Sequence, residues 1–69
     1  MNNTNEKLAH AFDQLAIQYK KDKFRSRAYR NAADIIRTHN GTILSGNEMM
    51  NVKGIGKSIA AKIDEILSC

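Results

Sequence analysis

A short run near the C-terminus has the residue types that can hold a phosphate group. It reads Val52-Lys53-Gly54-Ile55-Gly56-Lys57-Ser58. Two glycines one residue apart allow a tight turn with positive φ and no side chain in the way. If a helix begins directly after this turn, its free backbone N–H groups and its positive end favour an anion. We therefore predict a phosphate-binding hairpin with contacts from Lys53, Gly54, Gly56, Lys57 and Ser58.

Nucleotide-binding loops fit this run poorly. The third glycine of Gly-x-Gly-x-x-Gly and the first glycine of a P-loop are both missing, and no strand pattern precedes the run. Backbone contacts of the hairpin kind fix a position on a phosphate backbone without reading base sequence. The alternative is a purely structural turn. In either case we expect Ile55 to point inward and join the turn to the core.

Positive charge is concentrated in one stretch of the chain. The net charge is +4, and six of the eleven basic residues lie within positions 20–30, where Asp22 is the only acidic residue. The six are Lys20, Lys21, Lys23, Arg25, Arg27 and Arg30. A polyanion is the natural partner for such a cluster, and we expect Arg30 to be among its phosphate contacts. The alternative is a solvated helix face.

Helical periodicity accounts for most of the remaining pattern. Leu8, Phe12, Leu15 and Tyr19 recur at the spacing of one helix face. Four helices are predicted, over residues 5–19, 23–38, 46–51 and 57–67. A chain of 69 residues has room for one core. We therefore expect a single all-α domain over residues 1–69, a compact four-helix domain with a C-terminal helix-hairpin-helix motif.

Capping signals set the ends of these helices. We expect Asn3 or Thr4 to cap the first helix and Asp22 to cap the second. Asn40 or Gly41 would supply the left-handed residue that ends the second helix. The third helix is predicted from a capping box, Ser45-Gly46-Asn47-Glu48.

The apolar positions of the last three helices predict the rest of the core. From the third helix, Met49 or Met50 would enter it. The second helix would bury Ala28, Ala32, Ile35 and Ile36. The last helix would bury Ile59, Ile63, Ile66 and Leu67.

Several function classes are disfavoured by composition. No apolar run approaches the length of a membrane span, and no segment resembles a signal peptide. A single cysteine, Cys69, cannot form an internal disulfide, which fits a reducing compartment. No group of His, Cys and Asp residues suggests a metal site. We expect an intracellular monomer, nuclear if the source is eukaryotic, that binds DNA and no membrane.

Four patches of the sequence occur in an order and spacing shared with a known family. They are Arg27-Ala28-Tyr29-Arg30-Asn31-Ala32-Ala33, Leu44-Ser45-Gly46, Gly54-Ile55-Gly56 and Ile59-Ala60-Ala61-Lys62-Ile63-Asp64-Glu65-Ile66. These patches resemble the N-terminal domain of family X DNA polymerases over residues 8–67. The resemblance implies a fragment of a longer polymerase, active in DNA base excision repair. It would bind gapped or nicked DNA at the downstream 5′-phosphate.

Roles for individual residues follow from the same resemblance. In lyase-active members a lysine on the last helix forms a Schiff base with the abasic sugar, and that lysine matches Lys62. The resemblance implies that Tyr29 and Arg25 contact the 5′-phosphate and that Phe24, in place of a histidine, stacks on a template base. No cofactor is needed for the lyase step. A Na⁺ or K⁺ ion shared between the Gly54–Gly56 hairpin and DNA is implied, and Mg²⁺ belongs to polymerase domains absent from this chain.

The sequence departs from the family pattern around the phosphate. A lysine on the first turn of the last helix is Ser58 here, with Lys57 one place earlier, and a second pocket lysine is Met50. The proline before the hairpin is Lys53, and the acidic residue before the nucleophile is Ala61. The predicted phosphate pocket therefore has fewer positive charges than the family pattern, unless Lys53 and Lys57 substitute for the missing lysines.

The lyase reaction requires a neutral Lys62 amine, and the sequence does not decide whether the pKa of Lys62 is lowered enough to supply it. Only about 0.1% of an ordinary lysine is neutral near pH 7.4. Positive charge from Arg25, Arg30 and Lys57 would lower the pKa of Lys62, whereas pairing with Glu65 would oppose this. Two alternatives to a lyase remain. One is a non-catalytic helix-hairpin-helix module of a polymerase or structure-specific endonuclease, and the other is a small domain that contacts another protein.

Overall fold

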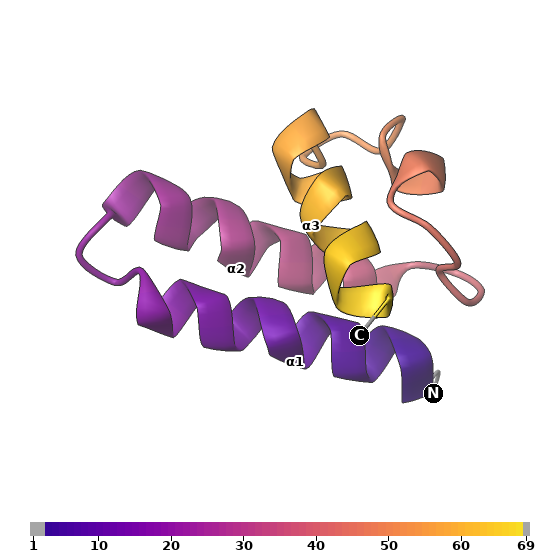
Figure 1. Ribbon diagram of the computed structural model, residues 1–69, viewed down its shortest axis with the longest axis horizontal. Coiled ribbons are helices and arrows are strands. Elements are labelled where there is room, and N and C mark those ends of the chain that lie inside the picture. Colours follow the sequence, from indigo (N-terminus) through magenta and orange to yellow (C-terminus); the bar gives the residue numbers. More distant parts are fainter. Residues whose placement is uncertain (1–2, 69) are drawn as a thin grey trace.

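Two antiparallel helices, α1 (Asn3–Gln18) and α2 (Lys23–Thr38), form the first half of the computed structural model, and α3 (Lys57–Leu67) lies across them (Figure 1). The structure describes residues 3–68, so Cys69 lies outside the described residues. One turn of 3₁₀ helix, η1 (Asn47–Met49), precedes the hairpin. The described part of the chain is all-helical, and none of its helices is both long and apolar enough to cross a membrane.

The expected count of four helices is not confirmed. Within residues 3–68 there are three α-helices, and the predicted helix over 46–51 is only the single turn η1. Ser45 Oγ accepts the Glu48 N–H at 3.4 Å, but the Glu48 carboxylate accepts the N–H of Leu44 rather than of Ser45. The capping box is thus displaced by one residue. The chain then turns at once toward the hairpin, because the Val52 N–H donates to Met49 O at 3.0 Å.

The predicted bounds of α2 and α3 are confirmed, and those of α1 need correction. The Asp22 carboxylate accepts the Arg25 N–H at 3.0 Å and caps α2 as expected. The expected left-handed cap is not what ends α2, because its C-cap is His39 in an extended conformation and Gly41, at φ +92°, comes two residues later in the loop. The prediction that Asn3 or Thr4 caps α1 is wrong, because α1 begins at Asn3 and both residues lie in its first turn.

The core lies where the three α-helices and the hairpin meet. Small side chains on both sides let α1 and α2 approach closely, namely Ala9 and Ala16 of α1 and Ala32 and Ala33 of α2. Two predicted positions of α2, Ala28 and Ile35, are only partly buried, and Tyr29 and Ala33 are buried instead. The largest fully buried side chains are Phe12, Leu8, Ile36, Ile43, Met49 and Ile63.

Polar contacts between distant segments hold these elements in register. Buried Asn5 of α1 donates from Nδ2 to Gly41 O at 2.7 Å and accepts the Ile43 N–H at 2.9 Å. Asp64 of α3 accepts the Gly46 N–H at 2.7 Å. Gly46 also packs against α3 so closely that an added Cβ would lie 1.8 Å from Ala60 O. The loop that leads into the hairpin is therefore fixed to both α1 and α3.

Candidate nucleic-acid interface

The hairpin turns at Gly54, where the backbone conformation favours glycine. Its φ of +99° lies in the left-handed region, which side-chain-bearing residues rarely adopt. A Cβ at this position would also meet Ile35 Cδ1 at 2.7 Å. The Ile55 N–H donates to Val52 O at 3.0 Å, and the Ile55 side chain is 3% exposed. The expectation that Ile55 joins the turn to the core is confirmed.

Gly56 differs from Gly54, because nothing in the protein requires a glycine there. Its backbone is extended, with φ −89° and ψ −179°, a conformation open to any residue. A Cβ at Gly56 would have no neighbour within 4 Å. Gly56 is the N-cap of α3 without a side-chain cap, and the first N–H groups of a helix have no acceptor within it. The missing side chain leaves room for a ligand to approach these donors.

An open groove of about 470 Å³, here called the hairpin groove, joins α2 to the hairpin. Its lining residues are Asp22, Phe24, Arg25, Ala28, Tyr29, Gly54, Gly56, Ser58 and Ile59. Six residues predicted as contacts thus share one site, although positions 24–29 and 54–58 are far apart in sequence. Phe24 stands at the groove with 88% of its surface exposed. The fold therefore places an aromatic ring, a guanidinium and a free helix N-terminus around one hollow.

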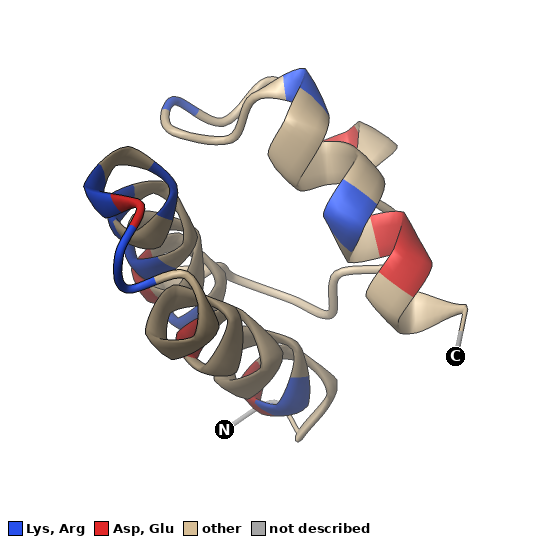
Figure 2. Ribbon diagram, turned by 60° about the vertical axis from the view of Figure 1, so that its left-hand side comes forward, with Lys and Arg blue, Asp and Glu red and all other residues tan. Residues whose placement is uncertain are grey.

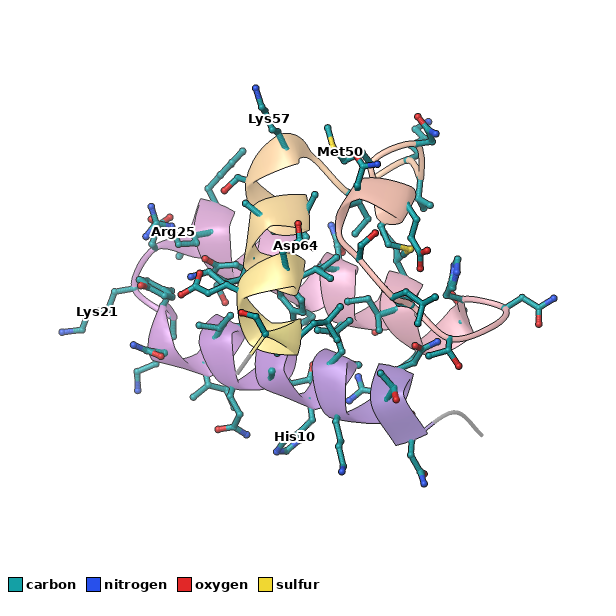
Figure 3. All side chains as sticks on the ribbon, turned by 45° about the vertical axis from the view of Figure 1, so that its right-hand side comes forward. His10, Lys21, Arg25, Met50, Lys57 and Asp64 are labelled. Atoms are coloured by element: carbon teal, nitrogen blue, oxygen red, sulfur yellow. The ribbon has the colours of Figure 1, made fainter. Side chains whose placement is uncertain are left out.

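Three other predicted contacts do not line the hairpin groove. Lys53 and Lys57 are exposed beside it, and the Lys57 side chain projects away from the body of the domain at the start of α3 (Figure 3). Arg30 lines a different hollow, on another side of α2. Figure 2 shows most Lys and Arg residues gathered at the α1–α2 turn and along α2, with others at the hairpin and the start of α3.

Arg25 has partners within the protein that sequence reasoning did not assign. Its Nε lies 3.8 Å from an Asp22 carboxylate oxygen, and its Cζ lies 4.9 Å from the centroid of the Tyr19 ring. The cation–π contact holds the guanidinium beside the groove. Asp22 partly neutralises Arg25 and is the one acidic residue in the groove lining. Its role as a cap was predictable from sequence, but its place beside Arg25 in the lining of the groove was not.

Tyr29 is mainly a core residue that reaches the hairpin groove at its edge. It is 8% exposed, and its ring centroid lies 5.8 Å from those of both Phe12 and Tyr19. Such tilted aromatic pairs are favourable contacts. The position of Tyr29 is therefore set by packing against α1, which also determines where α2 presents Arg25 to the groove.

Lys62 faces a second hollow, of about 320 Å³, between α1 and α3. The hollow is lined by Ala11, Gln14, Leu15, Gln18, Lys62, Glu65 and Ile66. Lys62 Nζ lies 3.2 Å from Glu65 Oε2. The hydrogen bond and charge of Glu65 raise the pKa of Lys62 above its ordinary value, with smaller contributions from Tyr29 and Tyr19. Arg25, Arg30 and Lys57 are not among the groups that shift this pKa, so the pairing with Glu65 prevails.

Among residues 3–68 no group of three or more His, Cys, Asp or Glu side chains is arranged to hold a metal ion. The hairpin side of the groove offers backbone N–H groups at the start of α3 and the Ser58 hydroxyl, with cations nearby. This set of groups suits an oxyanion such as a phosphate.

Comparison with known proteins bears on this geometry. A helix-hairpin-helix domain family matches residues 3–69, which is nearly the whole chain. No curated protein and no solved structure gives a significant match. The family match fits the N-terminal domain of family X polymerases at the level of the helix-hairpin-helix domain, and it indicates DNA binding. The chain belongs to the helix-hairpin-helix domain family.

Proposed function

We propose that the domain binds the 5′-phosphate side of gapped or nicked DNA through the hairpin groove. The observation that carries this proposal is the open space at Gly56, directly before the free N-terminus of α3 and across the groove from Arg25. A phosphate there accepts backbone N–H groups and meets the positive end of the helix. Ser58 adds a hydroxyl, and Lys53 and Lys57 add charge beside the groove.

Two features favour a strand end over continuous duplex. A terminal phosphate carries close to two negative charges near neutral pH, whereas a phosphodiester carries one, so a convergent donor site favours the end. Phe24 is almost fully exposed beside the groove, and a base stacks on such a ring only where it is free of its own neighbours. A gap or a nick offers both a terminal phosphate for the hairpin groove and a base that can stack on Phe24.

Binding of DNAs that differ only at the strand end tests the proposal. Fluorescence anisotropy would compare a gapped duplex bearing a 5′-phosphate, the same duplex bearing a 5′-hydroxyl, and an intact duplex. We expect about tenfold tighter binding to the phosphorylated gap, since a charge-assisted hydrogen bond contributes about 1.5–3 kcal/mol. Equal affinity for the phosphorylated and the hydroxyl-bearing gap would contradict the proposal. Lys7→Gln is the control variant, because Lys7 is exposed on α1 and does not line the hairpin groove. It should keep the preference for the phosphorylated gap.

We propose further that Lys62 acts on an abasic 5′ end as a Schiff-base nucleophile. The neutral amine adds to C1′ of the ring-opened deoxyribose 5-phosphate, and loss of water forms a C1′=N bond. Loss of the C2′ proton to water then breaks the C3′–O bond and frees the 5′-phosphorylated strand. Water hydrolyses the remaining imine, which releases the unsaturated sugar phosphate and restores the amine. What supports this role is that Lys62 lies one turn beyond Ser58 on α3, where it lines the hollow between α1 and α3 rather than the hairpin groove.

The lyase step requires the Lys62–Glu65 ion pair to open. Incubation with a 5′-incised abasic duplex and borohydride would convert the imine into a stable adduct. We expect a covalent adduct that is lost in Lys62→Ala and kept in Lys7→Ala. No adduct, together with intact 5′-phosphate-dependent binding, would instead identify a non-catalytic DNA-binding module.

The larger setting is part of the same proposal. We place the domain in a family X DNA polymerase acting in base excision repair, as an intracellular protein that binds DNA as a monomer. The lyase step needs no metal ion. Backbone carbonyl oxygens at the Gly54–Gly56 turn suit a Na⁺ or K⁺ ion shared with a DNA phosphate.

A further inference from the structure

A second group of cations lies on the side of α2 that faces away from the hairpin groove. Lys20, Lys23, Ser26, Arg27 and Arg30 line an open hollow of about 280 Å³, here called the basic face. Within residues 3–68, the ion pairs of basic side chains involve Arg25, Arg37 and Lys62. The four cations of the basic face are thus not neutralised by such pairs.

The basic face is continuous with the hairpin groove. Between them lies a third hollow, of about 390 Å³, lined by Lys23, Phe24, Arg27, Ala28 and Asn31. It shares Lys23 and Arg27 with the basic face, and Phe24 and Ala28 with the hairpin groove. The three hollows therefore form one track that passes from Gly56 over Phe24 and around α2 to Arg30.

The curvature of this track suits single-stranded nucleic acid better than duplex. It bends around a single helix, whose diameter with side chains is only about 10–12 Å. Duplex DNA has a persistence length of about 150 base pairs and does not follow so sharp a curve. A single strand does, and an exposed aromatic ring between cations is the arrangement that single strands use. From Lys23 to Arg30 the helix rises by about 10 Å, which is enough for more than one phosphate contact.

We propose that the basic face binds the unpaired strand of gapped DNA while the hairpin groove holds the phosphorylated end. This inference rests on the proposed function for its ligand, but it assigns a separate surface to a separate stretch of backbone. Lys20, Lys23, Arg27 and Arg30 contact phosphates, and Phe24 marks the point where the strand passes between the two sites.

The test removes two charges from the basic face and compares two DNAs. The variant Lys23→Gln/Arg27→Gln is measured on a duplex with an unpaired gap and on a blunt duplex with a 5′-phosphate and no single strand. We expect binding to the gapped DNA to weaken about 10- to 30-fold at 0.1 M salt and the salt slope to fall by about 1.4, or about 0.7 per lost single-strand contact. Binding to the blunt duplex stays unchanged.

The matched control is Lys7→Gln/Lys21→Gln. It removes the same charge from exposed residues that do not line the track, one of them in the α1–α2 turn, where Lys21 projects outward (Figure 3). Equal weakening in the control, or equal weakening on both DNAs, would overturn the inference in favour of a diffuse charge effect. The two proposals can fail separately. If the wild-type protein bound phosphorylated and hydroxyl-bearing gaps equally, the proposed function would fail. This inference would still stand if Lys23→Gln/Arg27→Gln reduced the salt slope of binding on gapped DNA alone.

Discussion

Lys62 and Glu65 form an ion pair one turn apart on α3, with Nζ 3.2 Å from Oε2. The pair lies in the hollow between α1 and α3, and it raises the pKa of Lys62 above its ordinary value. A Schiff base forms only from the neutral amine, so the pairing with Glu65 disfavours the form of Lys62 that the proposed lyase step needs. The proposed lyase activity therefore depends on what happens to Glu65.

Removing the carboxylate should make Lys62 more reactive. In Glu65→Gln the side chain keeps its size but loses the charge that raises the pKa of Lys62. The pKa then falls, and more of the amine is neutral at any pH below it. We expect the rate of borohydride-trapped adduct formation near pH 7 to rise about two- to fivefold, as suits an exposed ion pair. The pH–rate profile should shift toward lower pH.

Asp34→Asn controls for the change in net charge. Asp34 is exposed on α2, and this variant removes one negative charge far from α3 along the chain. It should leave the pH–rate profile of Lys62 unchanged. A profile that is the same in Glu65→Gln and wild type would show that the pair does not govern the reactivity of Lys62.

Substitution of the two hairpin glycines should affect different properties, namely stability at Gly54 and DNA binding at Gly56. Gly54→Ala places a side chain at φ +99° and against Ile35, so we expect a loss of about 1–2 kcal/mol in the free energy of unfolding. Gly56→Val meets no protein atom and has an extended backbone, so the helical circular dichroism spectrum should persist, with a melting temperature lowered only by the poorer N-cap. DNA binding should be lost in Gly56→Val, because the side chain occupies the space in front of the α3 donors. Unchanged affinity would remove the hairpin from the interface.

Neutralising Asp22 should strengthen DNA binding. Asp22 lines the hairpin groove and lies 3.8 Å from Arg25, where it opposes an incoming phosphate. Asn is as good an N-cap as Asp, so Asp22→Asn keeps the cap of α2 and removes only the charge. We expect about a twofold to fivefold gain in affinity at low salt that fades as salt is raised. Asp34→Asn again serves as the control, and an equal gain there would mean that only net charge matters.

Much of the fold could be predicted from the sequence because local signals agree. Asp22 caps the start of α2, and the apolar positions Ile59 and Ile63 mark the buried face of α3. The third predicted helix is reduced to the single turn η1, since the Glu48 carboxylate accepts the Leu44 N–H in place of the Ser45 N–H and Gly46 packs directly on Ala60. Periodicity carries no information on such a close approach between segments.

The candidate site was predictable as a set of residue types but not as an arrangement. Whether Arg25 or Arg30 faces the hairpin depends on the rotation of α2 about its axis, which the packing of Tyr29 on Phe12 and Tyr19 determines. Arg30 consequently lies on the basic face. The structural role of Asn5 was not predicted, because its two hydrogen-bond partners lie 36 and 38 residues away and no local sequence pattern indicates them.

Asn5 should be among the most sensitive positions for stability. Its side chain is buried and satisfies Gly41 O and the Ile43 N–H, which fixes the loop after α2 to α1. Asn5→Ala leaves the buried Ile43 N–H without this partner, at about 1–3 kcal/mol, whereas the exposed Gly41 O can bond to water instead. A domain of this size has only about 3–5 kcal/mol of stability, so we expect a large unfolded fraction at 37 °C.

Urea denaturation followed by far-UV circular dichroism measures this effect. Asn3→Ala is the control, because Asn3 is exposed in the same first turn of α1 and should change the midpoint little. If Asn5→Ala unfolded at the wild-type midpoint, the loop would not depend on this side chain. The expected loss also bears on function, since the same loop leads through η1 to Gly54 and fixes the hairpin opposite Arg25. Addition of 5′-phosphorylated gapped DNA should therefore partly restore the folded fraction of Asn5→Ala, because a ligand that binds only the folded state stabilises it.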